Sequence, residues 1–302
     1  MESRATAFQS VEGLSIVQIA TSDQDALEYI SCEKAIADGK VRLTEVNPSG
    51  SVNTITVVNE TDAYVFLMDG DILKGAKQNR VVNTSILLAP ESTTNISVSC
   101  VEQGRWSSKS PTFRTSDYTA PLSMRASKSA QVHANLRRRG EFAADQGGIW
   151  DRVAQYQAVF GTNSPTSSLS DTFDGMSDGL DRLLRKFSIN QHANGVAVFL
   201  GKKLAGIDIF NRRDVFAEYF PKLVRGAALE LRSGRQTGGR VSESEAKFRA
   251  LDALDQFSAS EFEEKPGVGV GTDRRCVPGL VAGFELVFRG SPVHTALFAG
   301  GE

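Results

Sequence analysis

Two short polar runs in the first third of the chain contain residue types from which a small-ligand site could be built. The first run lies directly between two stretches of strand-like composition and consists of Lys77, Gln78, Asn79 and Arg80. Strand alternation predicts Gln78 and Arg80 on one face. Arginine is the side chain best suited to bidentate contact with a phosphate or carboxylate. The simpler interpretation is an exposed strand end, and spacing alone favours it.

The second run extends from Cys100 to Trp106 and ends another strand-like stretch. Glu102 could pair with Arg105 or Arg80, act as an acid/base, or bind a ligand hydroxyl. Trp106 could stack on a base or a sugar. Spacing alone favours a buried structural ion pair and a core tryptophan. Cys100 is expected to be a small buried hydrophobe, because the sequence shows neither the base nor the electropositive site that a nucleophilic thiol needs.

Two glycine-containing motifs come close to nucleotide-binding fingerprints without matching them. The run Gly70–Lys77 lacks a lysine directly after its second glycine and the Ser or Thr that follows it in a P-loop. Gly267–Gly271 lacks the GxGxxG spacing, between strand and helix, of a dinucleotide-binding loop. We therefore expect turn and strand residues in the first motif and a flexible loop in the second.

The remaining charged features favour structural interpretations. Arg137–Arg139 and Arg274–Arg275 are basic clusters, which usually form solvated faces. Asp208 lies between two isoleucines of a predicted strand and is expected to face solvent. His294 lies in another β run and is expected to be a satisfied core histidine and not a catalytic base.

Composition argues against several functional classes. The chain has 302 residues, with 34 basic and 36 acidic side chains and a formal net charge of −2, whereas dedicated nucleic-acid binders normally carry a basic excess. The three His and three Cys residues are scattered without CxxC, HxxxH or HExxH spacing, which excludes the usual zinc patterns and a disulfide framework. We expect no metal, no cofactor and no nucleic-acid partner.

The cellular location is predicted from the N-terminus and from the apolar runs. No basic segment followed by an apolar stretch opens the chain, so it does not read as a signal peptide. No apolar run approaches the length of a membrane span. Sparse cysteines favour a reducing compartment. The sequence therefore predicts a soluble, cytoplasmic protein without a membrane partner.

Short strands dominate the predicted structure up to about residue 106. Strand-like runs occur at 14–20, 41–46, 52–58, 63–68, 80–88 and 95–101. A short helix is expected at about 31–38, with Ser31 suited to cap it and Gly39 suited to follow it. This spacing indicates a sandwich or small barrel and not a βαβ sheet.

The middle of the chain changes character. The apolar residues of 103–129 recur with neither helical nor strand periodicity, and this stretch is expected to form a long irregular segment. A more helical stretch at 126–160, a polar linker at 161–170 and a helix at about 173–187 are expected to follow.

Hairpins and helices are predicted for the rest of the chain. The hairpins are expected at 195–210 and at about 280–298. Between them, a helix with an apolar stripe starts near residue 212, and Pro221 should kink or split it. Ser242–Glu245 has the composition of a capping box and opens the next helix.

Together these elements predict an α+β fold. An N-terminal antiparallel β-sandwich or barrel-like sheet is expected to pack with a helical middle and a C-terminal region of hairpins and helices. We expect a single composite domain over 1–302. Its expected parts are a β-rich part at 1–106, an irregular and helical connecting part at 107–170 and an α+β part at 171–302.

The two polar runs, taken together, resemble the ARPP-1 family. The residues that carry this resemblance are Gly75–Arg80 and Cys100–Trp106, and further similarity lies in Gln146–Trp150, in Gly195–Phe210 with the helix after it, and in the final run to Phe298. Ile149 departs from the pattern, since a more polar residue is expected before Trp150. The similarity extends over nearly the whole chain, which favours one family unit.

The resemblance implies a connection to ADP-ribose and NAD chemistry. The family name stands for a domain associated with ADP-ribosylglycohydrolases and rhodanese-phosphatases. In that setting Arg80 and Arg105 would contact a diphosphate, and Trp106 would stack on adenine or ribose. Glu102 would accept from ribose hydroxyls, or act as the acid/base if the protein is an enzyme. The remaining ligand-binding residues would be Lys77, Gln78 and Asn79.

Two functions therefore stay open. The first is the binding or processing of an ADP-ribose- or NAD-related metabolite, a nucleotide-like small molecule. The alternative is a non-catalytic structural or protein-interaction module. An open cleft with Arg80, Glu102 and Arg105 converging on empty space would support the first, and a network closed to solvent the second. The sequence leaves open whether the chain is an enzyme and whether it forms a homo-oligomer.

Overall fold

The elements of the chain form two compact units. The computed structural model describes residues 2–234, 239–276 and 281–299. The unit that we call the terminal unit consists of Met1–Glu28, Asp178–Gly267 and Gly271–Glu302. The other, which we call the barrel unit, consists of Tyr29–Ser177 and Val268–Val270. The combination of antiparallel sheets and separate helices confirms the predicted α+β class.

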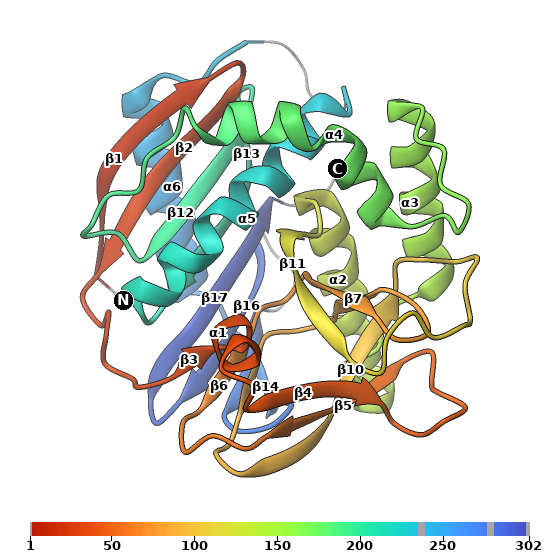
Figure 1. The fold of residues 1–302 in the computed structure, drawn as a ribbon. Helices are drawn as coiled ribbons and strands as arrows, with labels where there is room; N and C mark the ends of the chain where they lie inside the picture. The colour runs from red at the N-terminus through yellow and green to blue at the C-terminus, as the bar shows by residue number, and fades with distance from the viewer. Residues whose placement is uncertain (1, 235–238, 277–280, 300–302) are drawn as a thin grey trace. The chain divides into compact units, whose positions relative to one another are not determined.

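One antiparallel sheet of eight strands forms the framework of the terminal unit (Figure 1). In spatial order the strands are β1 (Ser3–Val11), β2 (Leu14–Thr21), β12 (Gly195–Leu200), β13 (Lys203–Phe210), β17 (Ser291–Ala299), β16 (Val281–Phe288), β15 (Thr272–Cys276) and β14 (Phe262–Pro266). Both predicted hairpins are confirmed, since β12 pairs with β13 and β16 with β17. Residue 280, at the start of the second predicted hairpin, lies outside the described residues.

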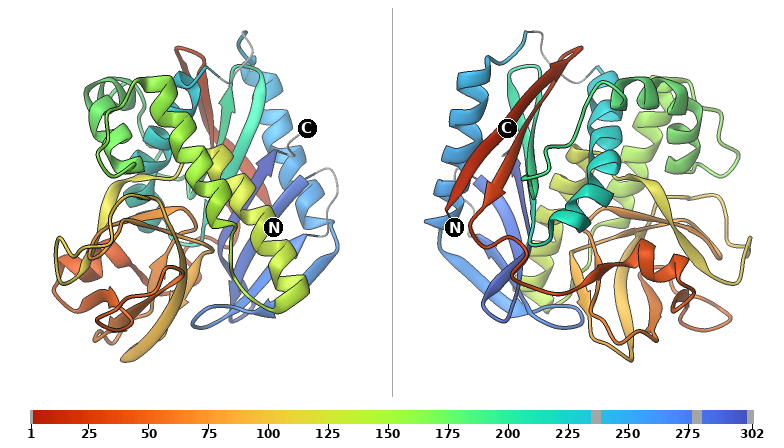
Figure 2. Two further views of the ribbon diagram at one scale, coloured as in Figure 1. Left: turned by 90° about the vertical axis from the view of Figure 1, so that its right-hand side faces the viewer. Right: turned by 60° about the vertical axis from the view of Figure 1, so that its left-hand side comes forward.

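Helices α5 (Arg213–Arg232) and α6 (Glu243–Ser258) cover opposite faces of this sheet (Figure 2). Strand β12 is buried along its whole length, as expected where both faces of a sheet are covered. The serine half of the predicted capping box is confirmed, because Ser242 Oγ accepts from the Glu245 amide at 3.3 Å, whereas the Glu245 side chain accepts from Arg249 at 3.4 Å. Pro221 was expected to kink or split a helix, but it lies inside the unsplit α5. Burial of the apolar face of α5 offsets the lost hydrogen bond.

A closed barrel of six strands forms the core of the barrel unit. Around the barrel the strands are β10 (Ser92–Cys100), β5 (Thr54–Asn59), β4 (Val41–Glu45), β11 (Phe113–Thr119), β7 (Asp71–Gly75) and β8 (Arg80–Val82). Alternation buries Ile55 and Val57 of β5, while Thr54 and Thr56 are half-buried. The apolar interior is filled with side chains, as in other small barrels.

A small sheet and four helices complete the barrel unit. The sheet consists of β3 (Ile30–Ser31), β6 (Val65–Leu67) and β9 (Ile86–Leu88). The helices are α1 (Cys32–Ala37), α2 (Leu122–Arg139), α3 (Gln146–Phe160) and α4 (Leu169–Leu184), the last of which continues into the terminal unit. The predicted cap of α1 is confirmed, since Ser31 Oγ accepts from the Lys34 amide at 3.2 Å.

The structure corrects the expectation of a long irregular segment over 103–129. Residues Phe113–Thr119 form β11, which lies between β4 and β7, and α2 already begins at Leu122. The sequence of β11 obscures its alternation because it is mostly polar. The predicted helical stretch at 126–160 is two helices, α2 and α3, and Gly140 ends the first in the left-handed conformation with φ of 71°.

Candidate functional site

Strand pairing brings the two polar runs together in the barrel unit. Arg80 begins β8, Cys100 ends β10, and these two residues are partners in the antiparallel register. Residues Lys77, Gln78 and Asn79 form the turn that leads from β7 into β8. The residues of the two runs are therefore neighbours in space, and each can be placed by its contacts.

Glu102 lies two residues beyond β10 and is 0 % exposed. Arg105 binds its carboxylate in a bidentate ion pair, with Nε donating to Oε1 at 2.8 Å and Nη2 to Oε2 at 2.6 Å. Thr166 Oγ1 donates to Oε1 at 2.7 Å, and the Asn79 amide donates to Oε2 at 3.0 Å. Both oxygens of the carboxylate therefore bind protein donors.

These contacts lower the pKa of Glu102. Burial by itself would raise it, but the hydrogen bonds from Arg105, Thr166 and the Asn79 amide outweigh burial. Glu102 is therefore ionised at neutral pH. A general acid needs the opposite, a raised pKa and contact with substrate, so the geometry favours a buried structural ion pair.

Arg105 also fixes the turn that precedes Arg80. Its Nη1 donates to the carbonyl oxygens of Ala76 at 2.5 Å and Ser107 at 2.8 Å, and its Nη2 lies 3.3 Å from the Gly75 carbonyl oxygen. Gly75 has φ of 124°, and a Cβ there would lie 2.7 Å from the Thr112 carbonyl oxygen. Only glycine meets both requirements.

Arg80 is 0 % exposed and holds several elements together. Its Nη1 donates to Gln78 Oε1 at 2.8 Å, which places both side chains on one face as alternation predicted, and also contacts Cys100 Sγ. Its Nη2 donates to the Ser51 carbonyl oxygen at 3.1 Å and lies 3.8 Å from Glu45 Oε1. Burial lowers the pKa of Arg80, although this guanidinium stays charged.

Two buried polar atoms of this cluster have unused hydrogen-bonding capacity. They are Arg80 Nε and Glu45 Oε2, for which the described part of the chain contains no hydrogen-bond partner. Buried polar atoms are normally satisfied. A bound water or ligand that contacts Arg80 Nε and Glu45 Oε2 would explain why both atoms lack a protein partner.

Cys100 Sγ contacts Gln78 Oε1 at 2.9 Å beside the Arg80 guanidinium. Burial raises the pKa of Cys100 to about 11, because the cost of desolvating a thiolate exceeds the attraction of the arginine. This supports the interpretation of Cys100 as a buried, inert thiol.

We expect Cys100 to resist alkylation by iodoacetamide at mildly alkaline pH, because the neutral thiol dominates there and is buried. Peptide mass spectrometry would measure its modification in the native protein and, as a control, in denaturant. Rapid modification of the native protein would contradict this assignment.

Trp106 is the exposed member of the region, with an exposed fraction of 44 %. Lys77 Nζ lies 5.7 Å and Arg80 Cζ 5.5 Å from the centre of its ring, which is within the range of cation–π attraction. Gly50, with φ of 77°, packs against this ring, and a Cβ there would approach Trp106 to 3.2 Å and Lys77 Cδ to 2.9 Å. The interpretation of Trp106 as a core tryptophan is wrong.

Sequence reasoning missed residues that join this region from distant parts of the chain. Glu45 at the end of β4, Ser51 and Thr166 supply contacts described above, and nothing in their spacing indicated it. Gln146 was noticed only within the similarity to the family. Its Oε1 accepts from the Cys100 amide and its Nε2 donates to the Cys100 carbonyl oxygen, both at 2.8 Å.

Two charged residues of the terminal unit, Asp208 and Arg275, are buried although they were expected to be exposed. Asp208 was expected to face solvent but is buried, and its Oδ1 lies 3.3 Å from Nε2 of His294. His294 is buried, as expected of a core histidine. Arg275 was expected on a solvated face but is also buried, with Nε 2.7 Å from Asp273 Oδ1.

The described ranges contain neither a metal-binding cluster nor a membrane-spanning helix. Over 2–234, 239–276 and 281–299, no group of three or more His, Cys, Asp or Glu side chains is arranged to hold a metal ion. The helices described there include none with the length and apolar character needed to cross a membrane.

Comparison with known proteins identifies the family. Neither the curated proteins nor the solved structures include a match to this chain. A family model described as the ARG and Rhodanese-Phosphatase-superfamily-associated Protein domain matches residues 2–298. This match covers nearly the whole chain and agrees with the resemblance seen in its polar runs, and the chain belongs to the ARPP-1 family.

Proposed function

We propose that the barrel unit binds an ADP-ribose- or NAD-related metabolite at the surface formed by Trp106 and Lys77, with the buried Arg80 supplying positive charge beneath the Trp106 ring. The observation that carries this proposal is an exposed tryptophan with two cations near its ring. An exposed aromatic ring can stack on a base, and neighbouring cations attract phosphate groups. The family name, which refers to association with ADP-ribosylglycohydrolases, is compatible with such a ligand.

The buried residues have a supporting role in this proposal. Glu102 and Arg105 join the 75–80 turn to the segment that carries Trp106, because Glu102 accepts from the Asn79 amide and Arg105 donates to the Ala76 carbonyl oxygen. Within the turn, Gln78 accepts from Arg80. Arg80 Nε and Glu45 Oε2 are the buried atoms with capacity left for a ligand or a bound water. Catalysis by Glu102 would require this segment to open, because the carboxylate has no exposed surface. Binding requires no such opening.

A second candidate function rests on a separate observation. The Glu102–Arg105 network is closed to solvent, as expected if these polar motifs mainly pin strands and loops together. A non-catalytic structural or interaction module would need only this network and no ligand. The two candidates differ in whether a nucleotide-like metabolite binds.

Calorimetry with ADP-ribose, NAD and AMP distinguishes metabolite binding from a structural or interaction module. We expect wild-type protein to bind ADP-ribose and Trp106→Ala to bind it about tenfold more weakly, since stacking on one aromatic ring contributes about 1–3 kcal/mol. Phe248→Ala is the matched control, because Phe248 is an aromatic side chain of α6 with an exposed fraction of 67 %. Absence of binding to all three ligands would remove the proposal and leave the structural module.

A further inference from the structure

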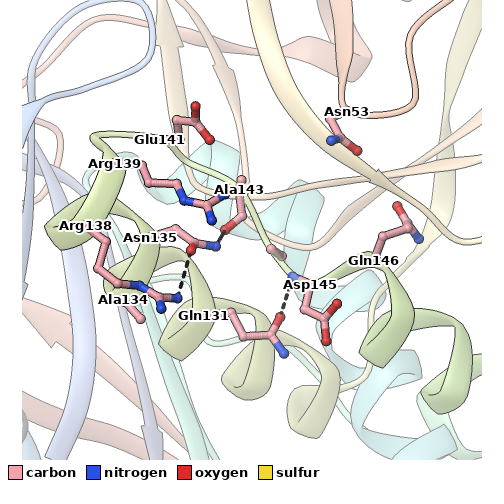
Figure 3. Close-up of a pocket in the computed structure, with 11 residues that line it drawn as sticks. Asn53, Gln131, Ala134, Asn135, Arg138, Arg139, Glu141, Ala143, Asp145 and Gln146 are labelled. Carbon is pink, nitrogen blue, oxygen red and sulfur yellow. Dashed lines mark hydrogen bonds between the residues drawn. The ribbon is translucent and has the colours of Figure 1, made fainter.

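A cavity of about 420 Å³ lies in the barrel unit, apart from the residues of the two polar runs (Figure 3). The end of α2, the connection from Glu141 to Asp145 and the start of α3 line it, together with Asn53. It is open to solvent on one side, where Arg138, Arg139 and Glu141 are exposed, and its volume lies within the range of about 300–1,000 Å³ that is typical of small-molecule sites. The proposed function leaves this cavity unassigned.

Amide side chains hold the walls of the cavity in place. Asn135 Nδ2 donates to the Ala143 carbonyl oxygen at 2.7 Å, and Gln131 Oε1 accepts from the Asp145 amide at 2.9 Å (Figure 3). Gln146 is fixed by its two hydrogen bonds to the backbone of Cys100. These bonds hold the connection between α2 and α3 at Ala143 and at its α3 end, so this wall of the cavity is in place without a ligand.

The charges around the cavity favour an anion. Arg138 and Arg139 extend from the last turn of α2, and Figure 3 shows both guanidinium groups beside Asn135. Arg138 Nη2 makes a long contact of 3.3 Å with Asn135 Oδ1. In the described part of the chain, no carboxylate lies within ion-pair distance of Arg138 or Arg139. The carboxylate of Asp145 is occupied, because it accepts from the first amides of α3.

Arginines are favourable at the C-terminus of a helix, which partly explains why Arg138 and Arg139 lie in the last turn of α2. This preference does not explain why a cavity lies beside them. Four polar groups of the lining have no hydrogen-bond partner among the described residues and can therefore contact a ligand. They are the Arg139 guanidinium, the Glu141 carboxylate, Gln131 Nε2 and the side-chain amide of Asn53. None of the lining residues that the structure describes is aromatic. The cavity thus offers cations for an anionic group and a carboxylate and amides for hydroxyl groups, but no ring on which a base could stack.

We propose that this cavity binds a small phosphorylated sugar, with Arg138 and Arg139 on the phosphate and with Glu141, Gln131 and Asn53 on the hydroxyl groups. Two neighbouring guanidinium groups suit a dianionic phosphate, because each can donate two parallel hydrogen bonds. Glu141 can accept from hydroxyls, and the amides can both donate and accept. This proposal does not depend on the proposed function, since the two sites share no residue.

Calorimetry with ribose 5-phosphate tests the proposal, with ribose and inorganic phosphate as the two fragments. We expect ribose 5-phosphate to bind more tightly than either fragment. Arg139→Gln should weaken its binding about tenfold, as loss of a charge-assisted contact implies. Arg137→Gln is the matched control, because it removes the same charge from the same helical turn without touching the lining. Circular dichroism would verify that both variants are folded.

Three outcomes would overturn the proposal. One is the absence of ribose 5-phosphate binding at millimolar concentration. Another is equal weakening by Arg137→Gln and Arg139→Gln, which would show attraction by net charge alone. The third is loss of ADP-ribose binding in Arg139→Gln, which would make this cavity the nucleotide site. Trp106→Ala should leave ribose 5-phosphate binding unchanged, so the failure of either proposal can be recognised separately.

Discussion

Replacement of Glu102 by glutamine is expected to lower the free energy of unfolding of the barrel unit by about 3 kcal/mol, because it leaves Arg105 buried without its counter-charge. The loss should depend on pH. The pKa of Glu102 in the folded protein lies below its usual value, so its contribution is present at neutral pH and is lost as pH falls through the folded pKa. Wild type and Glu102→Gln should therefore converge in stability in acid.

Urea denaturation followed by tryptophan fluorescence would measure this loss. Both tryptophans of the chain, Trp106 and Trp150, belong to the barrel unit, so the signal reports on that unit. Lys109→Gln is the control, because Lys109 Nζ lies 4.0 Å from Glu102 Oε1 but its side chain is largely exposed. It should change stability by less than about 0.5 kcal/mol. A variant Glu102→Gln as stable as wild type at neutral pH would show that the carboxylate is kept for function and not for structure.

Replacement of Asp69 by asparagine should cost more, about 4 kcal/mol, because Asp69 is in contact with two buried cations. Arg125 Nε lies 3.1 Å from Asp69 Oδ2, and Lys128 Nζ forms an ion pair with Oδ1. All three residues are almost completely buried. Loss of the negative charge removes a buried counter-charge from both cations in a medium of low polarity.

A double-mutant cycle with Lys128→Met checks this explanation. Lys128→Met alone should also destabilise, since Lys128 Nζ donates to the carbonyl oxygens of Val82 at 2.8 Å and Asn83 at 3.0 Å. The double variant should be more stable than the sum of the single losses predicts, by about 1–3 kcal/mol, because it removes a cation together with its counter-charge. Strictly additive losses in denaturation experiments would contradict the coupling.

The sequence predicted elements whose pattern is local. The cap of α1 by Ser31, the cap of α6 by Ser242 and the hairpin of β12 and β13 are each specified within a few residues, and all three are confirmed. Strand β11 was missed because its alternation is hidden among polar residues, and its place beside β4 and β7 depends on distant partners. The pairing of β2 with β12 likewise depends on contacts across most of the chain.

For the candidate site, too, the sequence indicated what is local and missed what depends on distant residues. The two polar runs could be recognised as belonging together, and alternation placed Gln78 beside Arg80. The sequence could not show that Glu45 and Thr166 complete their surroundings, because neither residue is near the runs along the chain. Similarly, nothing local to the basic cluster indicated that Arg138 and Arg139 border a cavity.

By itself, the sequence determined the α+β class, the local helices and hairpins, and the membership of the polar runs in one family pattern. Only the tertiary structure decided which side chains are exposed. Arg80 is buried and Trp106 is half exposed, the reverse of what their polarity suggests. The physical reason is that burial of a charge depends on partners that compensate its desolvation. Those partners of Arg80, at Glu45, Ser51 and Cys100, meet only when the barrel closes.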